Sequence, residues 1–155
     1  MKVDKMDMLV KVKMNAEDGK ATIKQLSALL YERGYVKKSY LRGVLEREEK
    51  YPTGLRLKGG INAALPHAEI EHVLKPALAV GILEKPVKFR NMERPEEFVE
   101  NVRMVFMPAL DKPHEYMKFL GSFAGKVLQE PTIIAELSSA STPSEVSKIL
   151  EEQLT

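Results

Sequence analysis

The chain contains few side chains that could act as nucleophiles or exchange protons near neutral pH. Its 155 residues include three histidines and no cysteine. The histidines are His67, His72 and His114. Imidazole is the side chain whose ordinary pKa lies closest to neutral pH, and its neutral form is a nucleophile. A search for covalent or proton-transfer chemistry therefore begins with these three residues.

The surroundings of His67 set it apart from the other two histidines. It follows Leu65 and Pro66 at the end of an apolar segment, residues 61–65, that has the length of a strand. Pro66 has a fixed φ angle and keeps Leu65 extended, so the imidazole is predicted to project from a stiff strand end. Sites of α/β domains are found at strand ends. The same pattern is also typical of a surface or capping histidine beside a turn, and it does not separate the two interpretations.

Hydrophobic patterning predicts the elements that must position these residues. Strands are expected at residues 6–14, 61–65, 77–82, 86–90 and 100–110, and helices at 21–33, 37–49, 112–128, 131–137 and from 141 onward. Met117 is expected on the apolar face of the third helix. Helices on both sides of the strand region favour a sheet covered on two faces. We therefore expect one domain over residues 1–155, a three-layer α/β/α sandwich with a mixed sheet of about four to five strands.

Composition narrows the classes of function. Lys and Arg total 24 against 22 Asp and Glu, and these charges are scattered, which disfavours a nucleic-acid partner. The absence of cysteine removes disulfide frameworks, thiolate nucleophiles and cysteine metal sites, and it fits a cytoplasmic location. No apolar stretch approaches the length of a membrane span, and the first residues lack an apolar signal core, so no direct membrane insertion is expected. The sequence also lacks a phosphate-binding loop of the Gly-x-x-x-x-Gly-Lys-Ser/Thr type, so no ATP site is expected.

A longer stretch around His67 carries a family resemblance. Residues 47–54 read REEKYPTG, and residues 61–67 read INAALPH. This resembles the enzyme IIA component of the phosphoenolpyruvate-dependent sugar phosphotransferase system, fructose and mannitol class, whose signature is an Arg-Glu helix end, a Thr-Gly turn and a strand ending in Ile-Pro-His. The Tyr-Pro-Thr-Gly sequence, together with His72 five residues after the first histidine, is most similar to the galactitol-specific branch. The similarity covers roughly residues 20–150.

The resemblance implies a phosphotransferase that acts as a relay through a phosphohistidine and needs no cofactor. His67 would accept a phosphoryl group from the phosphocarrier protein HPr and pass it to a cysteine of enzyme IIB, with a membrane enzyme IIC as an indirect partner. Arg47 stands at the arginine of the family motif, where its guanidinium would meet the phosphoryl charge. Thr53 would donate a further hydrogen bond. Both residues also fit structural roles, as a surface ion pair and a plain turn.

The resemblance leaves the residue that assists His67 open. In many fructose and mannitol relatives a second active-site histidine stands where this chain has Tyr116, and His114 lies two residues earlier. Two residues along a helix is a large angular displacement, so His114 is not simply equivalent. His72 is the rival. It would either hydrogen-bond the phosphoryl oxygens or pack a short helical turn at residues 69–73.

Other functions fit the same residues. A metal site made of His67, His72 and either Glu69 or Glu71 is disfavoured, because a five-residue separation does not match a pair on one helix face. A free-standing regulatory protein of the same fold, which signals through its phosphorylation state, is the main alternative to a transport relay. A protein that binds an anion without becoming phosphorylated is a third interpretation.

Overall fold

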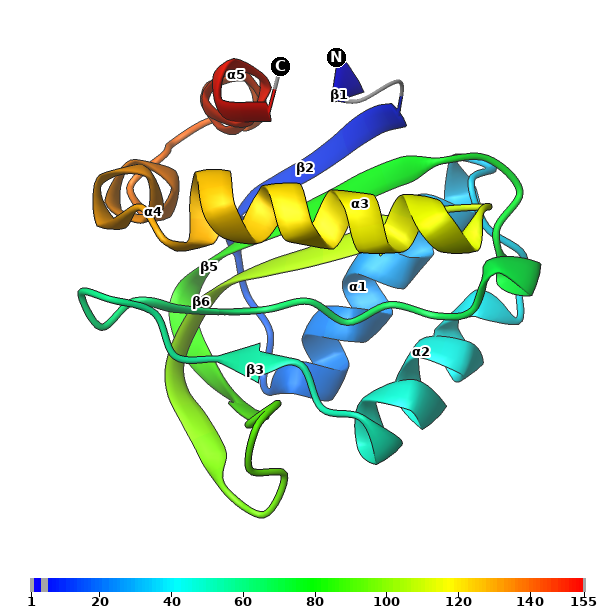
Figure 1. Ribbon diagram of the computed structural model, residues 1–155, viewed down its shortest axis with the longest axis horizontal. Helices are drawn as coiled ribbons and strands as arrows, with labels where there is room; N and C mark the ends of the chain where they lie inside the picture. The colour runs from blue at the N-terminus through cyan, green and yellow to red at the C-terminus, as the bar shows by residue number, and fades with distance from the viewer. Residues whose placement is uncertain (1, 4–5, 155) are drawn as a thin grey trace.

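The computed structural model describes residues 2–3 and 6–154, which form a mixed sheet with helices on both faces (Figure 1). The strands are β1 (Lys2–Val3), β2 (Met6–Met14), β3 (Gly54–Leu55), β4 (Asn62–Ala64), β5 (Ala77–Arg90) and β6 (Phe98–Ala109). The helices are α1 (Gly19–Glu32), α2 (Tyr40–Lys50), α3 (Pro113–Phe123), α4 (Pro131–Ser138) and α5 (Pro143–Leu154). Two short helical turns, η1 (Ile70–His72) and η2 (Ala124–Leu128), complete the set.

The sheet has the order β1-β2-β5-β6-β4-β3. Strand β2 is parallel to β5, and β4 is parallel to β6, whereas the other neighbouring pairs are antiparallel. The predicted three-layer α/β class is confirmed. The strand count is six because two-residue strands, β1 and β3, lie at the two edges. The segments expected at 77–82 and 86–90 form the single strand β5, since a register irregularity before Val87 accommodates Pro86.

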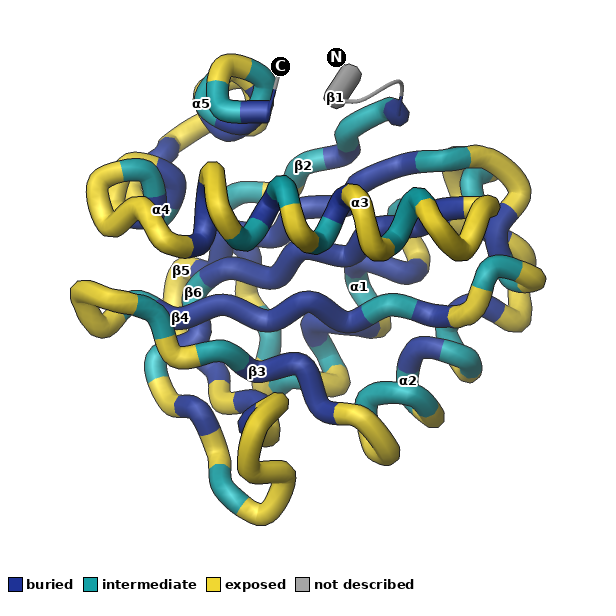
Figure 2. The backbone as a smooth tube through the Cα atoms, viewed as in Figure 1, coloured by how far each residue is buried: buried dark blue, intermediate teal, exposed yellow. Residues whose placement is uncertain are grey.

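Each face of the sheet carries its own hydrophobic core. Figure 1 shows α3 crossing one face, with α1 and α2 on the opposite side. The core under α1 and α2 includes Leu26, Leu30, Tyr40 and Val44. The core under α3, α4 and α5 includes Phe106, Phe119, Phe123, Ile134 and Leu150. The central strands β5 and β6 lie between these layers, and Figure 2 shows long stretches of both as buried.

The ends of α1 follow the expected cap chemistry. The side chain of Asp18 accepts a hydrogen bond of 2.8 Å from the backbone N–H of Ala21, which satisfies one of the free donors of the first turn. Gly34, just beyond the helix, has a φ angle of 82°, in the left-handed region that glycine adopts without strain. The predicted glycine stop of this helix is therefore confirmed.

Helix α3 and the turn after it bury most of the residues predicted for their apolar face, but not Met117. The side chains turned toward the sheet are those of Phe119 and Phe123, with Val127 in the following turn η2. Met117 is 76% exposed, so its expected place on the apolar face is wrong. The buried residues recur every four positions from 119 to 127, and Met117 lies on a neighbouring row of the helix surface.

The topology brings three distant segments to one end of the sheet. Strands β4 and β6 are parallel and run toward the same end of the sheet, where Ala64, the last residue of β4, pairs with Val105 and β6 continues to Ala109. The chain leaves α2 and enters β3, which pairs with β4. Residues 47–54, 65–72 and 110–116 therefore meet at the carboxyl ends of these strands. Within the described part of the chain, no helix has the length and apolar character needed to cross a membrane.

Candidate functional site

His67 lies just beyond the carboxyl end of β4, half-buried, with its ring fixed by the backbone. Its Nδ1 is 2.9 Å from the carbonyl oxygen of Leu65. A carbonyl oxygen can only accept a hydrogen bond, so Nδ1 must carry the hydrogen and donate it. In the neutral ring, Nε2 is then the nitrogen with a free lone pair. Nε2 is thus the ring nitrogen that is able to act as a nucleophile.

The protonation of His67 is set by its surroundings. Burial lowers the pKa of this imidazole below its ordinary value of 6.5, and the nearby positive charge of Arg47 acts in the same direction. The hydrogen bond to Leu65 and the negative charge of Glu69 oppose this shift. Because the lowering effects win, the ring is neutral at pH 7 and its lone pair is available.

Tyr116 supports the ring of His67 from α3. The two ring centroids are 5.2 Å apart, with an interplanar angle of 34°. The Tyr116 hydroxyl accepts a hydrogen bond of 3.2 Å from the N–H of Leu110 and lies 3.0 Å from the carbonyl oxygen of Ala68, to which it donates. Burial raises the pKa of Tyr116 to about 12, so the phenol stays protonated. The hydroxyl therefore ties the end of β6 to the backbone next to His67.

Arg47 reaches the same place from the last turns of α2. Its Nη1 is 2.5 Å from Oε1 of Glu69, which lies two residues beyond His67. Its guanidinium carbon is 5.4 Å from the ring centre of Tyr51. The Nε atom is buried and has no hydrogen-bond partner among the described residues. A guanidinium group, a carboxylate and an imidazole thus share this end of the sheet.

Thr53 has a role that its sequence context does not reveal. Its N–H and its hydroxyl both donate to the carboxylate of Glu48, at 2.9 and 2.7 Å. The hydroxyl also accepts a hydrogen bond of 3.2 Å from the N–H of Leu65, whose carbonyl holds His67. Thr53 is therefore a brace between the end of α2 and the backbone that orients the imidazole.

Glu48 is a site residue that sequence reasoning missed. Burial raises its pKa from 4.5 to about 7, although both hydrogen bonds from Thr53 and the charge of Arg47 favour the ionised form. The signal available in the sequence was its place next to Arg47 in the Arg-Glu motif. Its partner is five residues away around a turn, and local patterning does not reveal that contact.

Gly54 explains the second half of the Thr-Gly turn. A Cβ atom at this position would lie 2.6 Å from the carbonyl oxygen of Arg90 in β5, closer than two such atoms can approach. The glycine therefore allows the backbone of β3 to pass close to β5.

His72 is used to dock η1 against α2. Its Nδ1 is 2.8 Å from the hydroxyl of Ser39, and its carbonyl accepts a hydrogen bond of 2.9 Å from the N–H of Lys37. A Cβ atom on Gly43 would be 2.9 Å from the His72 ring, so the imidazole lies directly against α2. These contacts match the packing alternative that the sequence left open for His72.

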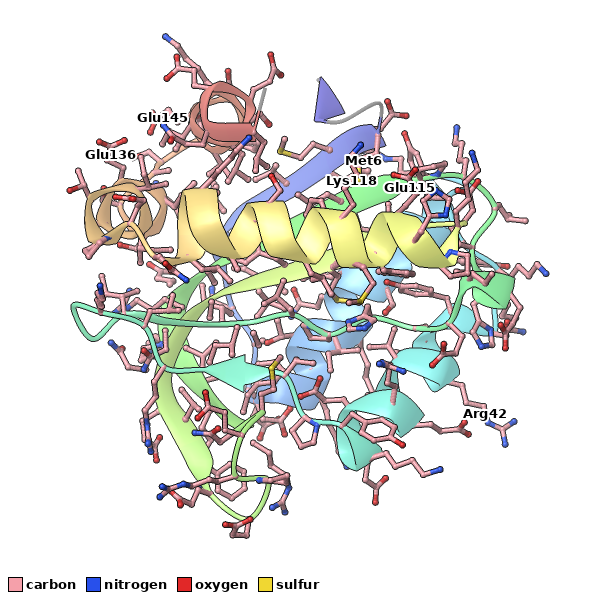
Figure 3. All side chains as sticks on the ribbon, in the orientation of Figure 1. Met6, Arg42, Glu115, Lys118, Glu136 and Glu145 are labelled. Carbon is pink, nitrogen blue, oxygen red and sulfur yellow. The ribbon has the colours of Figure 1, made fainter. Side chains whose placement is uncertain are left out.

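His114 lies apart from the His67 cluster. It stands at the exposed start of α3, where its side chain is 76% exposed and its Nε2 is 3.3 Å from Oε1 of Glu115. Figure 3 labels Glu115 at this end of α3. The structure therefore does not bring His114 to His67, because two residues along the helix turn it away from the face that Tyr116 occupies.

The described residues give no support to a metal site. Among residues 6–154, no group of three His, Asp or Glu side chains is arranged to hold a metal ion. Glu69 contacts Arg47, and His72 contacts Ser39. The structure instead places together a neutral imidazole, a guanidinium group and a supporting phenol ring, which suits a covalent bond to a small anionic group.

The chain matches a known protein family and known structures. The family described as "Phosphoenolpyruvate-dependent sugar phosphotransferase system, EIIA 2" matches residues 6–153. A protein of Streptococcus mutans described as a PTS IIA (PtxA) has 25% sequence identity and a TM-score of 0.77, covering 94% of this chain and 88% of that protein.

Two further proteins are similar to this chain. The chain of an Escherichia coli complex between mannitol enzyme IIA and phosphorylated enzyme IIB has 22% identity and a TM-score of 0.70, and the match covers 96% of each chain, which shows the shared fold. Transcriptional regulator ManR of Bacillus subtilis (strain 168) is 30% identical over 131 residues, or 84% of this chain. The match covers 18% of ManR, so the chain spans about a fifth of the length of this curated relative.

Proposed function

Since the chain belongs to the type 2 enzyme IIA family of the phosphoenolpyruvate-dependent sugar phosphotransferase system, we propose that it carries a phosphoryl group on Nε2 of His67. The observation that carries this proposal is the hydrogen bond from Nδ1 to the Leu65 carbonyl. It leaves Nε2 unprotonated in a half-buried ring whose pKa is lowered. Reversible transfer needs a nucleophile and correct positioning, and both are present.

The proposed reaction is a pair of displacements at phosphorus. The Nε2 lone pair of His67 attacks the phosphoryl group of phospho-HPr, and the bond from phosphorus to the donor nitrogen breaks, with its electron pair returning to that nitrogen. A cysteine thiolate of enzyme IIB then attacks the same phosphorus, and the electron pair of the Nε2–P bond returns to His67. No proton needs to leave His67, because Nδ1 keeps its hydrogen bond to Leu65 throughout.

Each residue around His67 has a separate proposed role in this transfer. Arg47 is proposed to meet the charge of the phosphoryl oxygens, since its guanidinium reaches the site and lowers the pKa of His67. Thr53 is proposed to support His67 through Leu65 rather than to bind phosphate, because both its donors are used by Glu48. His72 is proposed to hold the loop that follows His67. The exposed position of His114 argues against a direct role.

The partners follow from this assignment. HPr is the proposed donor, and a cysteine-bearing enzyme IIB is the proposed acceptor. The fold shared with an enzyme IIA that forms a complex with phosphorylated enzyme IIB supports the second partner. The protein would work in the cytoplasm and meet a membrane enzyme IIC only through enzyme IIB. A galactitol-like substrate for the whole system rests on the Tyr-Pro-Thr-Gly sequence and on His72 alone.

A regulatory role is the second candidate, and the likeness to ManR favours it. A stretch like this chain forms part of a transcriptional regulator there. In such a role, His67 would accept a phosphoryl group and hold it as a signal. The two functions differ in their second step, since only the transport relay requires rapid transfer to a thiol of enzyme IIB.

Labelling with phosphoenolpyruvate, enzyme I and HPr tests the proposed function. We expect the protein to gain one acid-labile phosphoryl group, detected by intact mass, and His67→Ala to abolish it. Arg47→Gln is expected to slow labelling by about 100-fold or more, as the loss of one preorganised hydrogen-bond donor does in other active sites. Subsequent addition of enzyme IIB should remove the label if the protein is a transport relay.

Matched variants keep this test specific. Arg42→Gln removes an arginine of the same helix whose side chain is 85% exposed and, in Figure 3, projects away from the molecule. It should label at the wild-type rate within about twofold. His114→Ala should do the same. An unlabelled wild-type protein in the presence of competent phospho-HPr would rule out the relay, and a label retained after enzyme IIB is added would favour the regulatory role.

A further inference from the structure

The guanidinium group of Arg47 already has an anionic partner. Oε1 of Glu69 lies 2.5 Å from Nη1 of Arg47, and Glu69 is only two residues beyond His67. A carboxylate is planar and a phosphoryl group is tetrahedral, but both offer a guanidinium oxygen atoms that carry negative charge. Glu69 therefore occupies the contact that a phosphoryl group on His67 would need.

The contact between these two residues can be exchanged. The side chains of Arg47 and Glu69 are 32% and 60% exposed, and ion pairs of this exposure are weak because water screens them and the side chains lose entropy on pairing. Among the described residues, Arg47 is the one hydrogen-bond partner of the Glu69 carboxylate. Glu69 can thus turn into solvent without breaking another contact, whereas Arg47 is packed beside Tyr51.

We propose that Glu69 is a displaceable anion that pairs with Arg47 in the unphosphorylated protein and must leave when a phosphoryl group binds there. This inference rests on the proposed function, because it names His67 as the place where the phosphoryl group arrives. The carboxylate keeps the guanidinium oriented in the empty site and lowers the affinity of the site for phosphate. The same competition favours release of the phosphoryl group to the next acceptor.

The charges around His67 agree with this role. Arg47 and Glu69 shift the pKa of His67 in opposite directions, so both charges act at the imidazole. After displacement, the Glu69 carboxylate remains near a phosphoryl group that is itself negative, which raises the free energy of the phosphorylated state. Glu71, two residues further along the exposed turn η1, carries the same charge and is not among the groups that shift His67. It offers a matched control.

Titration with inorganic phosphate tests the proposal on the full chain. The ring signals of His67 are followed by NMR in wild type, Glu69→Gln and Glu71→Gln. We expect Glu69→Gln to bind phosphate about three- to fivefold more tightly, the upper part of the range set by loss of one exposed ion pair, and Glu71→Gln to stay within about twofold of wild type. In an Arg47→Gln background, Glu69→Gln should lose most of its effect, because the competition requires the guanidinium.

Three results would overturn the proposal: equal or weaker phosphate binding by Glu69→Gln, an equal gain in Glu71→Gln, or no binding in any variant. Glu69→Ala serves as a second variant in case Glu69→Gln does not fold. The phosphorylated form of Glu69→Gln should also lose its label to enzyme IIB more slowly, by about three- to fivefold. If wild type is never labelled by phospho-HPr, the relay fails, and the phosphate titration still decides the role of Glu69.

Discussion

At His67, the direction of one hydrogen bond decides which ring nitrogen can react. The Leu65 carbonyl accepts a hydrogen bond from Nδ1–H, and the lone pair of Nε2 is left for an incoming electrophile. Tyr116 holds this arrangement from the other side, with its ring beside the imidazole and its hydroxyl on the backbone. Here the phenol supports His67 through the backbone.

Two tyrosines allow the contribution of this hydroxyl to be measured. Tyr116→Phe leaves the N–H of Leu110 without its acceptor, so we expect the free energy of unfolding to fall by about 1–2 kcal/mol. Tyr40→Phe removes a fully buried hydroxyl that has no partner among the described residues, so stability should change by less than about 0.5 kcal/mol or rise. Urea unfolding at pH 7 measures both. Equal losses in the two variants would contradict the bracing role of Tyr116.

At the scale of elements, Glu48 connects α2 to the strands that carry the site. Its carboxylate accepts hydrogen bonds from the N–H and the hydroxyl of Thr53, and the Thr53 hydroxyl accepts one from the N–H of Leu65. The cost of this connection is burial of a carboxyl group, which raises its pKa to about 7. The junction between helix and strand is therefore sensitive to pH in a range where most carboxyl groups are already ionised.

The stability of this junction should depend on Glu48. Between pH 4.5 and about 7 the folded protein holds the Glu48 proton more tightly than the unfolded chain does. The contribution of this proton to the free energy of unfolding is therefore full below pH 4.5 and is lost as the pH rises through 7. We expect Glu48→Gln to remove this slope. The difference in unfolding free energy between wild type and variant should change by about 2 kcal/mol between pH 4.5 and 8, after allowance for screening.

Urea titrations across this pH range provide the measurement. Glu49→Gln changes the same charge at the neighbouring, exposed position of α2 and should leave the slope of wild type intact. Parallel curves for wild type and Glu48→Gln would show that the carboxyl group of Glu48 ionises without penalty. That result would contradict a raised pKa of the buried Glu48 carboxyl group.

At the scale of the whole molecule, the sequence predicts what is local and misses what depends on contact between elements. The alternation at residues 6–14 predicts β2 with its correct bounds, but the residues that are buried, Met6, Leu9 and Met14, do not follow that alternation because both faces of the strand are covered. Leu65-Pro66-His67 likewise predicts a histidine at a strand end. The pairing of Glu48 with Thr53 depends on how α2 meets β3, and the exposure of Met117 depends on which row of α3 faces the sheet. Neither the pairing nor the exposure can be predicted from the spacing of apolar residues along the chain.

The three layers together set the pH range in which His67 can react. Burial between α2, α3 and the end of β4 is the largest cause of its lowered pKa, and Arg47 adds to it. We therefore expect an NMR titration of the His67 ring to have its midpoint below 6.5 in the folded protein and to return to about 6.5 in concentrated urea. Phosphoryl acceptance should accordingly persist at pH 6.5 and decline only as pH falls through the lowered midpoint, because protonation consumes the Nε2 lone pair.

The charged neighbours should move this midpoint in opposite directions. Arg47→Gln removes a charge that lowers the pKa of His67, so its midpoint should shift toward higher pH, whereas Glu69→Gln removes a charge that raises it and should shift the midpoint lower. Arg42→Gln, on the exposed side of α2, should match wild type. A folded midpoint at or above 6.5 would mean that the imidazole is better solvated than its position implies. A higher midpoint in Arg47→Gln together with a lower midpoint in Glu69→Gln would show that both charges act on the imidazole proposed to carry the phosphoryl group.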